Sequence, residues 1–180
     1  MDRYTEYANA EMVISEIYNA KNKDPFGKKV LQKMVYLAQQ KGAVLGYDFR
    51  LHFYGPYSAE LDTDTMCLQA YGEVSCEHTS NGHLLSLAEP EVSVLSRPNL
   101  DDTTLESIRS VATRYSDWTP SSLELLSTAI YAYRYLDSQK GSLSKEDIVS
   151  KVQSIKGEKY TKKAIEEMLG EFEFYGISLN

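Results

Sequence analysis

The spacing of apolar positions along the chain predicts a mainly helical protein. Apolar residues recur three and four positions apart over long stretches, which is the period of a helix with one buried face. We therefore predict helices over residues 6–19, 25–40, 59–70, 101–114, 119–136, 144–155 and 160–175. The helix over residues 119–136 is apolar on two sides, which is typical of a helix at the centre of a core.

The start and end of the second helix are predicted from its residue types. Pro25 suits the first turn of a helix, because its missing N–H is not needed there. Asp24 can cap this turn with its side chain. Gly42 is the expected stop signal at the other end.

Two segments break the helical pattern. Residues 45–54 are rich in aromatic side chains and are predicted to be extended, and Gly55–Pro56 then forces a turn. Residues 73–87 are predicted to form a β-hairpin, because Asn81–Gly82 supplies the positive φ angles of a tight turn. Residues 89–100 contain two prolines and no period, which indicates a linker or a surface excursion.

The order of these elements predicts the fold class. Three helices followed by a hairpin are the order of a winged helix, in which the hairpin would be the wing. We predict a mainly α fold with minor β content, with a winged-helix-like part over residues 1–90. A helical part over residues 101–180 follows and ends in a second helix-turn-helix. The two parts are expected to pack as one compact unit or as two small ones.

Composition limits the setting of the protein without changing this fold. The hydrophobic fraction of 42% and the charged fraction of 25% are ordinary for a globular protein. No window is apolar over the length of a transmembrane helix, so we expect no membrane association. The N-terminus lacks the features of a signal peptide, and two cysteines do not make a disulfide framework. These features predict a cytoplasmic protein.

The distribution of charge bears on nucleic-acid binding. A net charge of −7 disfavours a general nucleic-acid binder, because phosphate contacts supply most of such affinity. Residues 21–41 carry six lysines and one acid, whereas residues 58–106 carry ten acids and one base. The expected recognition helix of a winged helix, residues 59–70, has three acids and no lysine or arginine. The lysines between residues 145 and 163 are the better nucleic-acid candidates.

Sequence motifs of known chemistry are scarce. The chain has no G-x-S-x-G, no phosphate loop and no G-x-G-x-x-G, so we predict no enzyme and no cofactor. Cys67, Cys76, His78 and His83 are the only metal-like set, and their spacing lacks the close cysteine pair of most zinc sites. Cys76 and His78 can share one strand face, with His83 across the hairpin. Coincidence outweighs a structural zinc site on this spacing, and no metal is predicted.

Residues 31–61 form the densest run of specific-looking residues. Residues 52–57 (HFYGPY) favour a structural corner with aromatic side chains packed beneath it, since Gly-Pro has a sufficient backbone reason to be there. A partner-binding surface is the other interpretation, because Tyr and His offer apolar bodies with polar tips, and both can hold together. Gln32 is expected to hydrogen-bond the adjacent extended segment. Lys33 is expected either to meet an acid such as Glu60 or to be solvated.

The same residues carry a family resemblance. Residues 31–37 (LQKMVYL) resemble the LQK helix of the Panacea domains, a group that includes SocA-like antitoxins, and residues 49–61 (FRLHFYGPYSAEL) resemble that group's aromatic-Tyr-Gly-Pro motif. A closer resemblance is to the uncharacterised YwgA-like proteins of bacteria and archaea, which carry an FHFYGPYS-type stretch after an LQK helix. Residues 123–128 and 144–149 are also similar to that group. The Panacea resemblance implies binding to a toxin protein, and for SocA-like members delivery of a toxin to a protease, without catalysis.

We therefore expect a non-enzymatic protein-interaction module that binds a protein partner. Its partner surface would centre on Lys33, Tyr36, His52, Tyr54 and Tyr57. The alternative is a winged-helix transcription regulator that binds DNA through the lysine-rich C-terminal helices. The 14 tyrosines also leave a homodimer interface open.

Overall fold

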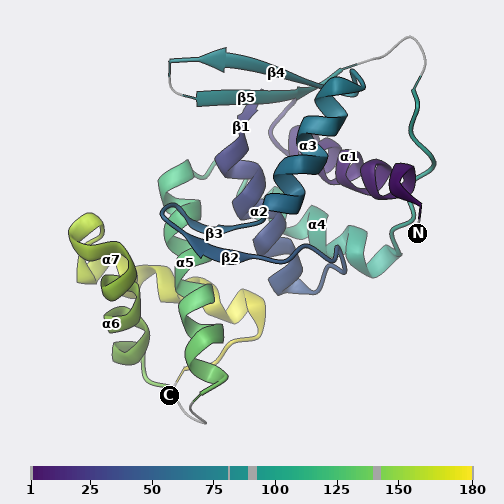
Figure 1. Cartoon of the computed structure of the whole chain (residues 1–180). Helices are drawn as coiled ribbons and strands as arrows, with labels where there is room; N and C mark the ends of the chain where they lie inside the picture. Colours follow the sequence, from purple (N-terminus) through teal and green to yellow (C-terminus); the bar gives the residue numbers. More distant parts are fainter. Residues whose placement is uncertain (1, 81, 89–92, 140–142, 180) are drawn as a thin grey trace.

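The computed structural model describes residues 2–80, 82–88, 93–139 and 143–179 and confirms a mainly helical fold with minor β content (Figure 1). In chain order, the α-helices of these residues are α1 (Arg3–Ala20), α2 (Lys28–Lys41), α3 (Ala59–Ala70), α4 (Asp102–Arg114), α5 (Pro120–Asp137), α6 (Lys145–Lys156) and α7 (Lys162–Met168). Two 3-10 helices complete the C-terminal part, η1 (Gly157–Lys159) and η2 (Leu169–Tyr175).

The strands form two small antiparallel sheets. A three-stranded sheet has the order β1 (Phe26–Gly27), β5 (Gly82–Leu87), β4 (Val74–Thr79), so the predicted hairpin over residues 73–87 is confirmed. A second hairpin joins β2 (Arg50–His52) and β3 (Gly55–Tyr57). Asn81 of the predicted β4–β5 turn lies outside the described residues, as do residues 89–92 of the predicted linker.

The predicted start of the second helix is wrong. Phe26 and Gly27 are extended and pair with β5, so the helix begins at Lys28 and not at Pro25. Its N-cap is Gly27, which makes no side-chain cap, and Asp24 does not cap it. Phe26 is buried, and its pairing with a strand nearly sixty residues away outweighs the local preference of Pro25 for a helix start.

Two further boundaries differ from the sequence prediction. The first helix begins at Arg3, because the Asp2 side chain accepts a hydrogen bond from Thr5 N and caps it. Gly55 and Pro56 belong to β3, so the chain reverses before them, between His52 and Gly55. The corner of the sequence prediction is therefore a second, shorter hairpin.

The core runs through α2 and α5. Every residue from 30 to 38 and from 123 to 130 is buried. The helix α4 packs against α1 and α2, while α5 contacts α2 and β3 on one side and α6, α7 and η2 on the other. One cluster of buried side chains includes residues from α1 through η2, so the N- and C-terminal parts share a core.

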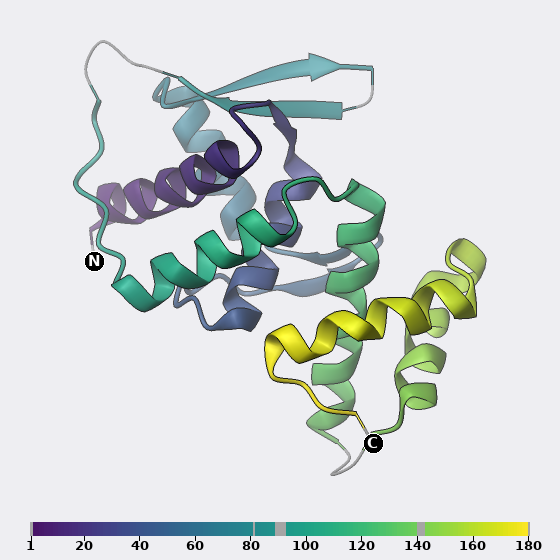
Figure 2. The ribbon, with the colours of Figure 1, turned by 180° about the vertical axis from the view of Figure 1, so that it is seen from behind.

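The arrangement of elements places the β4–β5 hairpin and the helices α6 and α7 at opposite ends of the molecule (Figures 1 and 2). The chain order of α1, β1, α2, α3, β4 and β5 is interrupted by the β2–β3 hairpin. Membership of the winged-helix class stays a prediction. Among the described residues, no helix has the length and apolar character needed to cross a bilayer.

Candidate functional site

The β2–β3 hairpin, here called the corner (residues 50–57), is the most unusual feature of the N-terminal part. Its two strands make three residue pairs, in which Arg50 faces Tyr57 and His52 faces Gly55. The hairpin lies across α2 and reaches α5 (Figure 1). A two-stranded hairpin of this length is not stable by itself in water, so other elements must hold it.

The first anchor of the corner is Gln32 on α2. Its amide donates to the Ser58 carbonyl over 2.9 Å and accepts from Ser58 N over 2.8 Å. Gln32 was predicted to hydrogen-bond the extended segment over residues 45–54, but its partner is Ser58, which directly follows β3. The Ser58 hydroxyl in turn caps α3 by accepting from Leu61 N, so one buried glutamine fixes the start of α3 against α2.

The second anchor is Lys33. Its side chain is buried, and Nζ donates to the Pro56 carbonyl over 2.7 Å. Neither an ion pair with Glu60 nor solvation describes it, and both of those expectations are wrong. Burial lowers the pKa of Lys33 to about 8, although the attraction of Glu124 acts in the opposite direction.

Gly55 brings the corner into direct contact with α5. It has a φ of +88°, a conformation that side chains with a Cβ rarely adopt. A Cβ at this position would lie 2.8 Å from Thr128 Oγ1, which is too close for real contacts. Glycine is required here both by the backbone angle and by the approach to α5.

Glu124 is the centre of a buried cluster of charges between α5, α6 and η1. Its Oε1 accepts a hydrogen bond of 2.7 Å from Lys156 Nζ and another of 2.7 Å from Lys159 Nζ. Lys156 also donates to the Phe53 carbonyl over 2.9 Å, which ties the corner to the C-terminal part. The side chains of Glu124 and Lys156 are only 7% and 3% exposed.

The cluster around Glu124 contains more positive than negative groups. Burial alone would raise the pKa of Glu124, but its bonds to the two lysines outweigh burial and hold that pKa below its usual value. Burial lowers the pKa of Lys156, against the effect of Glu124, and Lys159 lowers it further. Since Lys33 and Lys29 also lie close by, four lysines gather around one carboxylate.

A pocket of about 200 Å³ opens between the corner and the start of α5. We call it the lysine pocket; it is lined by Lys29, Lys33, Tyr54, Pro120, Ser121, Glu124 and Lys159. The Lys29 Nζ lies 3.7 Å from the centre of the Tyr54 ring, and the Lys159 Nζ lies 5.9 Å from it. Excess positive charge and a ring held by cations make this pocket suited to an anionic group.

The end of the corner exposes apolar surface beside the lysine pocket. Phe53 is 78% exposed, and its neighbours Leu51 and Tyr54 are 40% and 39% exposed. The rings of Phe53 and Tyr54 meet edge to face, with centroids 5.0 Å apart. The backbone that carries these apolar side chains is held by hydrogen bonds from Gln32, Lys33 and Lys156.

The five residues predicted to form a partner surface separate into two groups. Lys33 and Tyr36 are buried and do not face outward, and Lys33 supports the corner through its bond to Pro56. Tyr36 packs against Phe49 and Tyr131, and burial raises its pKa. His52 and Tyr54 are exposed, and Tyr57 is half-buried with its ring 5.4 Å from that of His52.

The lysines proposed for DNA binding are mostly occupied by other groups. Lys156 and Lys159 bind Glu124, Lys162 lies 2.7 Å from Glu146, and Lys163 lies 3.7 Å from Glu167. Lys151 lies over the ring of Tyr135. These pairings reduce the positive field that the C-terminal helices could offer to phosphate.

Sequence reasoning missed the residues that hold the corner from the C-terminal side. Glu124, Lys156 and Lys159 lie about seventy to a hundred positions from it in the chain, and no local pattern joins them. A signal was present in Glu124 itself, which is a lone carboxylate among the apolar positions of a helix buried on both sides. Such a position calls for a cationic partner.

Comparison with known proteins finds sequence similarity to a bacterial protein. No protein-family model matches it. The chain is 32% identical over 149 residues to a protein of Bacillus subtilis (strain 168) with the name Uncharacterized protein YwgA. The alignment covers 79% of this chain and 82% of that protein. That name states no activity, partner or ligand.

Proposed function

The chain belongs to the YwgA-like family, and from the geometry of the corner we propose that it is a non-enzymatic module that binds a partner protein through this hairpin. The observation that carries the proposal is Phe53, a large apolar side chain 78% exposed at the end of a short hairpin. Single exposed apolar residues are common and need no explanation. Phe53 differs because hydrogen bonds from side chains of two helices, α2 and α6, hold the backbone that presents it.

Rigid presentation favours binding. Association costs conformational entropy when loops and side chains must become ordered, and a fixed hairpin avoids much of that cost. Lys33 and Lys156 donate to the carbonyls of Pro56 and Phe53, on either side of Tyr54 and Gly55. Aromatic anchors of this kind dominate the binding energy of protein interfaces.

The lysine pocket defines the chemistry of the proposed partner. An acidic side chain next to apolar residues would place its carboxylate near Lys29 and Lys159 while the apolar residues cover Phe53. Complementary charge speeds association and orients the partner, whereas the aromatic contact supplies affinity. The resemblance to Panacea-type antitoxins suggests a toxin as the class of partner in this proposal.

The test starts from an affinity purification in cells that naturally contain the protein, followed by reconstitution with the purified partner. We expect Phe53→Ala to weaken the reconstituted complex by about 30-fold, the effect of losing an interface anchor of about 2 kcal/mol. Val44→Ala is the matched control, because Val44 is 77% exposed on a different segment and should leave affinity unchanged.

A second pair of variants tests the charge component. Lys29→Glu should weaken binding and reduce its dependence on salt, since Lys29 lies at the lysine pocket. Lys163→Glu makes the same change in net charge on α7, where the side chain is 85% exposed, and should have little effect. A partner that binds Phe53→Ala and wild type equally well, or salt-sensitive DNA binding that Lys163→Glu weakens more than Lys29→Glu, would overturn the proposal.

A further inference from the structure

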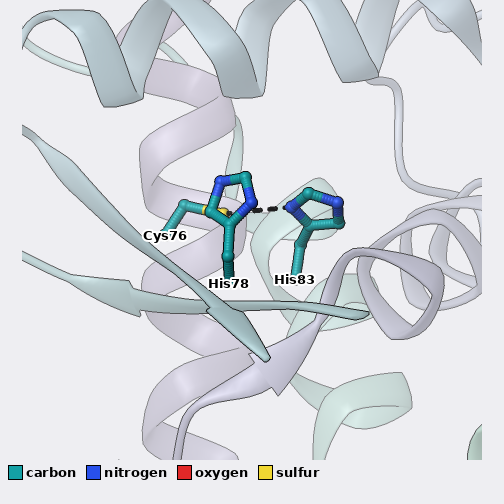
Figure 3. A group of neighbouring side chains, drawn as sticks. All are labelled: Cys76, His78 and His83. Atoms are coloured by element: carbon teal, nitrogen blue, oxygen red, sulfur yellow. Dashed lines mark hydrogen bonds between the residues drawn. The ribbon is translucent and has the colours of Figure 1, made fainter. Parts of the chain in front are cut away.

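The β4–β5 hairpin gathers three side chains that can bind a metal ion. His78 and His83 face each other across the two strands, and Cys76 lies two residues before His78 on β4. Because side chains two apart on a strand project from the same face, all three lie on one side of the hairpin. Figure 3 shows them side by side, and their ring nitrogens and sulfur point toward a common region.

The distances between donor atoms are close to those of a metal site. Cys76 Sγ lies 4.0 Å from His83 Nδ1, and one donor atom from each of the three residues lies within 4.8 Å of the others. Tetrahedral zinc with Zn–S near 2.3 Å and Zn–N near 2.05 Å needs donor separations of about 3.3–3.6 Å. Both histidines are exposed and Cys76 is only half-buried, so small side-chain rotations can close the difference.

Most of the histidines and cysteines of the chain lie on this hairpin. The protein has three histidines and two cysteines in all, and this one hairpin holds two of the histidines and one of the cysteines. Cys67, the fourth residue of the metal-like set in the sequence, is not part of the group. It lies on α3, where it accepts a hydrogen bond from Tyr7.

We infer that Cys76, His78 and His83 form a binding site for a zinc-type divalent cation. One thiolate and two imidazoles are ligands that zinc prefers, and the group contains no carboxylate of the kind that calcium or magnesium requires. Three protein ligands leave one tetrahedral position open to water or to a ligand from another molecule. This inference is independent of the proposed partner binding at the corner, since the site lies on a different hairpin.

Metal binding at this position would act on the hairpin as a whole. The ion would join β4 and β5 next to their connecting turn, and β5 also pairs with β1, which leads directly into α2. Binding to the folded state alone stabilises that state by mass action. Because protons compete for the thiolate and the imidazoles, acidification weakens the binding.

The experiment uses the full chain, reduced and freed of metal by a chelator that is then removed. Zinc is titrated by calorimetry, and cobalt(II) serves as a spectroscopic probe because thiolate coordination gives a charge-transfer band in the near ultraviolet. We expect one ion per chain and a cobalt spectrum of tetrahedral type. Cys76→Ser should abolish the charge-transfer band, and His78→Ala or His83→Ala should each weaken zinc binding by at least about tenfold, since even supporting residues of metal sites cost that much.

The chain supplies its own matched controls. Cys67→Ser and His52→Ala remove the remaining cysteine and histidine and should leave both titrations unchanged. Circular dichroism of each variant checks that the fold is retained. Absence of a cobalt–thiolate band in the wild type, or a band that survives Cys76→Ser and disappears in Cys67→Ser, overturns the inference. Zinc binding that His83→Ala does not weaken overturns it as well.

Discussion

The molecule contains two β-hairpins that are held in different ways. The β4–β5 hairpin makes six residue pairs and gains a third strand from β1. The corner makes three pairs, and the described structure gives it no third strand. Its backbone is held instead by Gln32, Lys33 and Lys156, which donate to carbonyls within or beside it.

The difference shows two routes to a rigid hairpin. The longer hairpin is held by backbone hydrogen bonds between its strands. The side chains on its exposed face are therefore available for other chemistry, such as the three proposed metal ligands. In the corner the buried side chains are committed to holding the backbone, and only the end of the hairpin presents surface to a partner. The corner should therefore be sensitive to changes far away in sequence, and the following substitutions test that dependence.

The largest effect is expected at Glu124. Glu124→Gln leaves Lys156 buried without its counter-charge, which should lower the free energy of unfolding by about 3 kcal/mol. Urea denaturation at neutral pH measures this change. Glu146→Gln is the control, because the Glu146–Lys162 bridge has the same 2.7 Å length but both side chains are more than half exposed. It should cost less than about 1 kcal/mol.

A double variant separates loss of charge balance from loss of packing. Glu124→Leu combined with Lys156→Met removes both charges and should recover most of the stability, because replacing a buried ion pair by apolar residues is often neutral. If Glu124→Gln costs no more than Glu146→Gln, the charge cluster does not hold the corner, and the contrast between the two hairpins loses its physical basis.

The next effect in size is expected at Gly55. Gly55→Ala must place a Cβ at positive φ and 2.8 Å from Thr128 Oγ1, and should lower the free energy of unfolding by about 2–3 kcal/mol. Gly46→Ala is the matched control, because Gly46 has a φ of +78° with no atom near its added Cβ. It should show the backbone strain alone, about 1–2 kcal/mol.

A second substitution should remove the part of the Gly55→Ala destabilisation that comes from crowding against Thr128. The Thr128 hydroxyl is buried, and no hydrogen-bond partner is found for it among the described residues. Adding Thr128→Ala to Gly55→Ala should therefore return the loss to that of Gly46→Ala. Equal losses for Gly55→Ala and Gly46→Ala as single variants would show that the approach of the corner to α5 is loose.

The sequence predicted those parts of the fold that local chemistry decides. Helical periodicity located each α-helix of the described residues, and Asn-Gly located the β4–β5 hairpin. The start of α2 could not be found in this way, because β1 exists only through its pairing with β5. The prediction of an extended segment over residues 45–54 includes β2, but β3 and its pairing with β2 were missed for a related reason, since the corner is held partly by side chains on other helices.

The candidate site was predictable only in part. The sequence singled out Gln32 as a hydrogen-bonding residue, although its partner Ser58 lies beyond the predicted extended segment. The burial of Lys33 did not, because a lysine on a helix is ordinarily solvated and only the Pro56 carbonyl and the nearby Glu124 make its burial tolerable. The metal-binding group also needed the strand register, which puts His83 opposite His78.

A smaller effect is expected from the titration of Lys33. Its folded-state pKa of about 8 lies below the value of about 10.4 in an unfolded chain, so between these values the unfolded state binds the extra proton. The stability of wild type relative to Lys33→Met should therefore rise as pH increases from 8 to 9.5, by about 1–2 kcal/mol. Comparing the two chains at each pH cancels the tyrosines that titrate at higher pH.

The charged groups around Lys33 set the control for this measurement. Glu124, Lys156, Lys29 and Lys159 all act on its pKa. Lys163→Met removes a lysine that is 85% exposed, and its stability relative to wild type should stay level over the same pH range. A level curve for Lys33→Met as well would mean that the Lys33 ammonium remains hydrated and that the corner is not held by a buried cation.

The smallest effect on stability is expected at Phe53, where the proposed function is concentrated. Phe53 is 78% exposed, so Phe53→Ala should change the free energy of unfolding by less than about 0.5 kcal/mol while it weakens partner binding strongly. The anchors behave in the opposite way, because Gln32 and Lys33 are buried and their removal loosens the hairpin before it can affect a partner. Thermal unfolding of Phe53→Ala beside its binding curve makes the comparison. A large loss of stability in this variant would mean that the end of the corner is packed into the fold, and that its exposure cannot serve a partner.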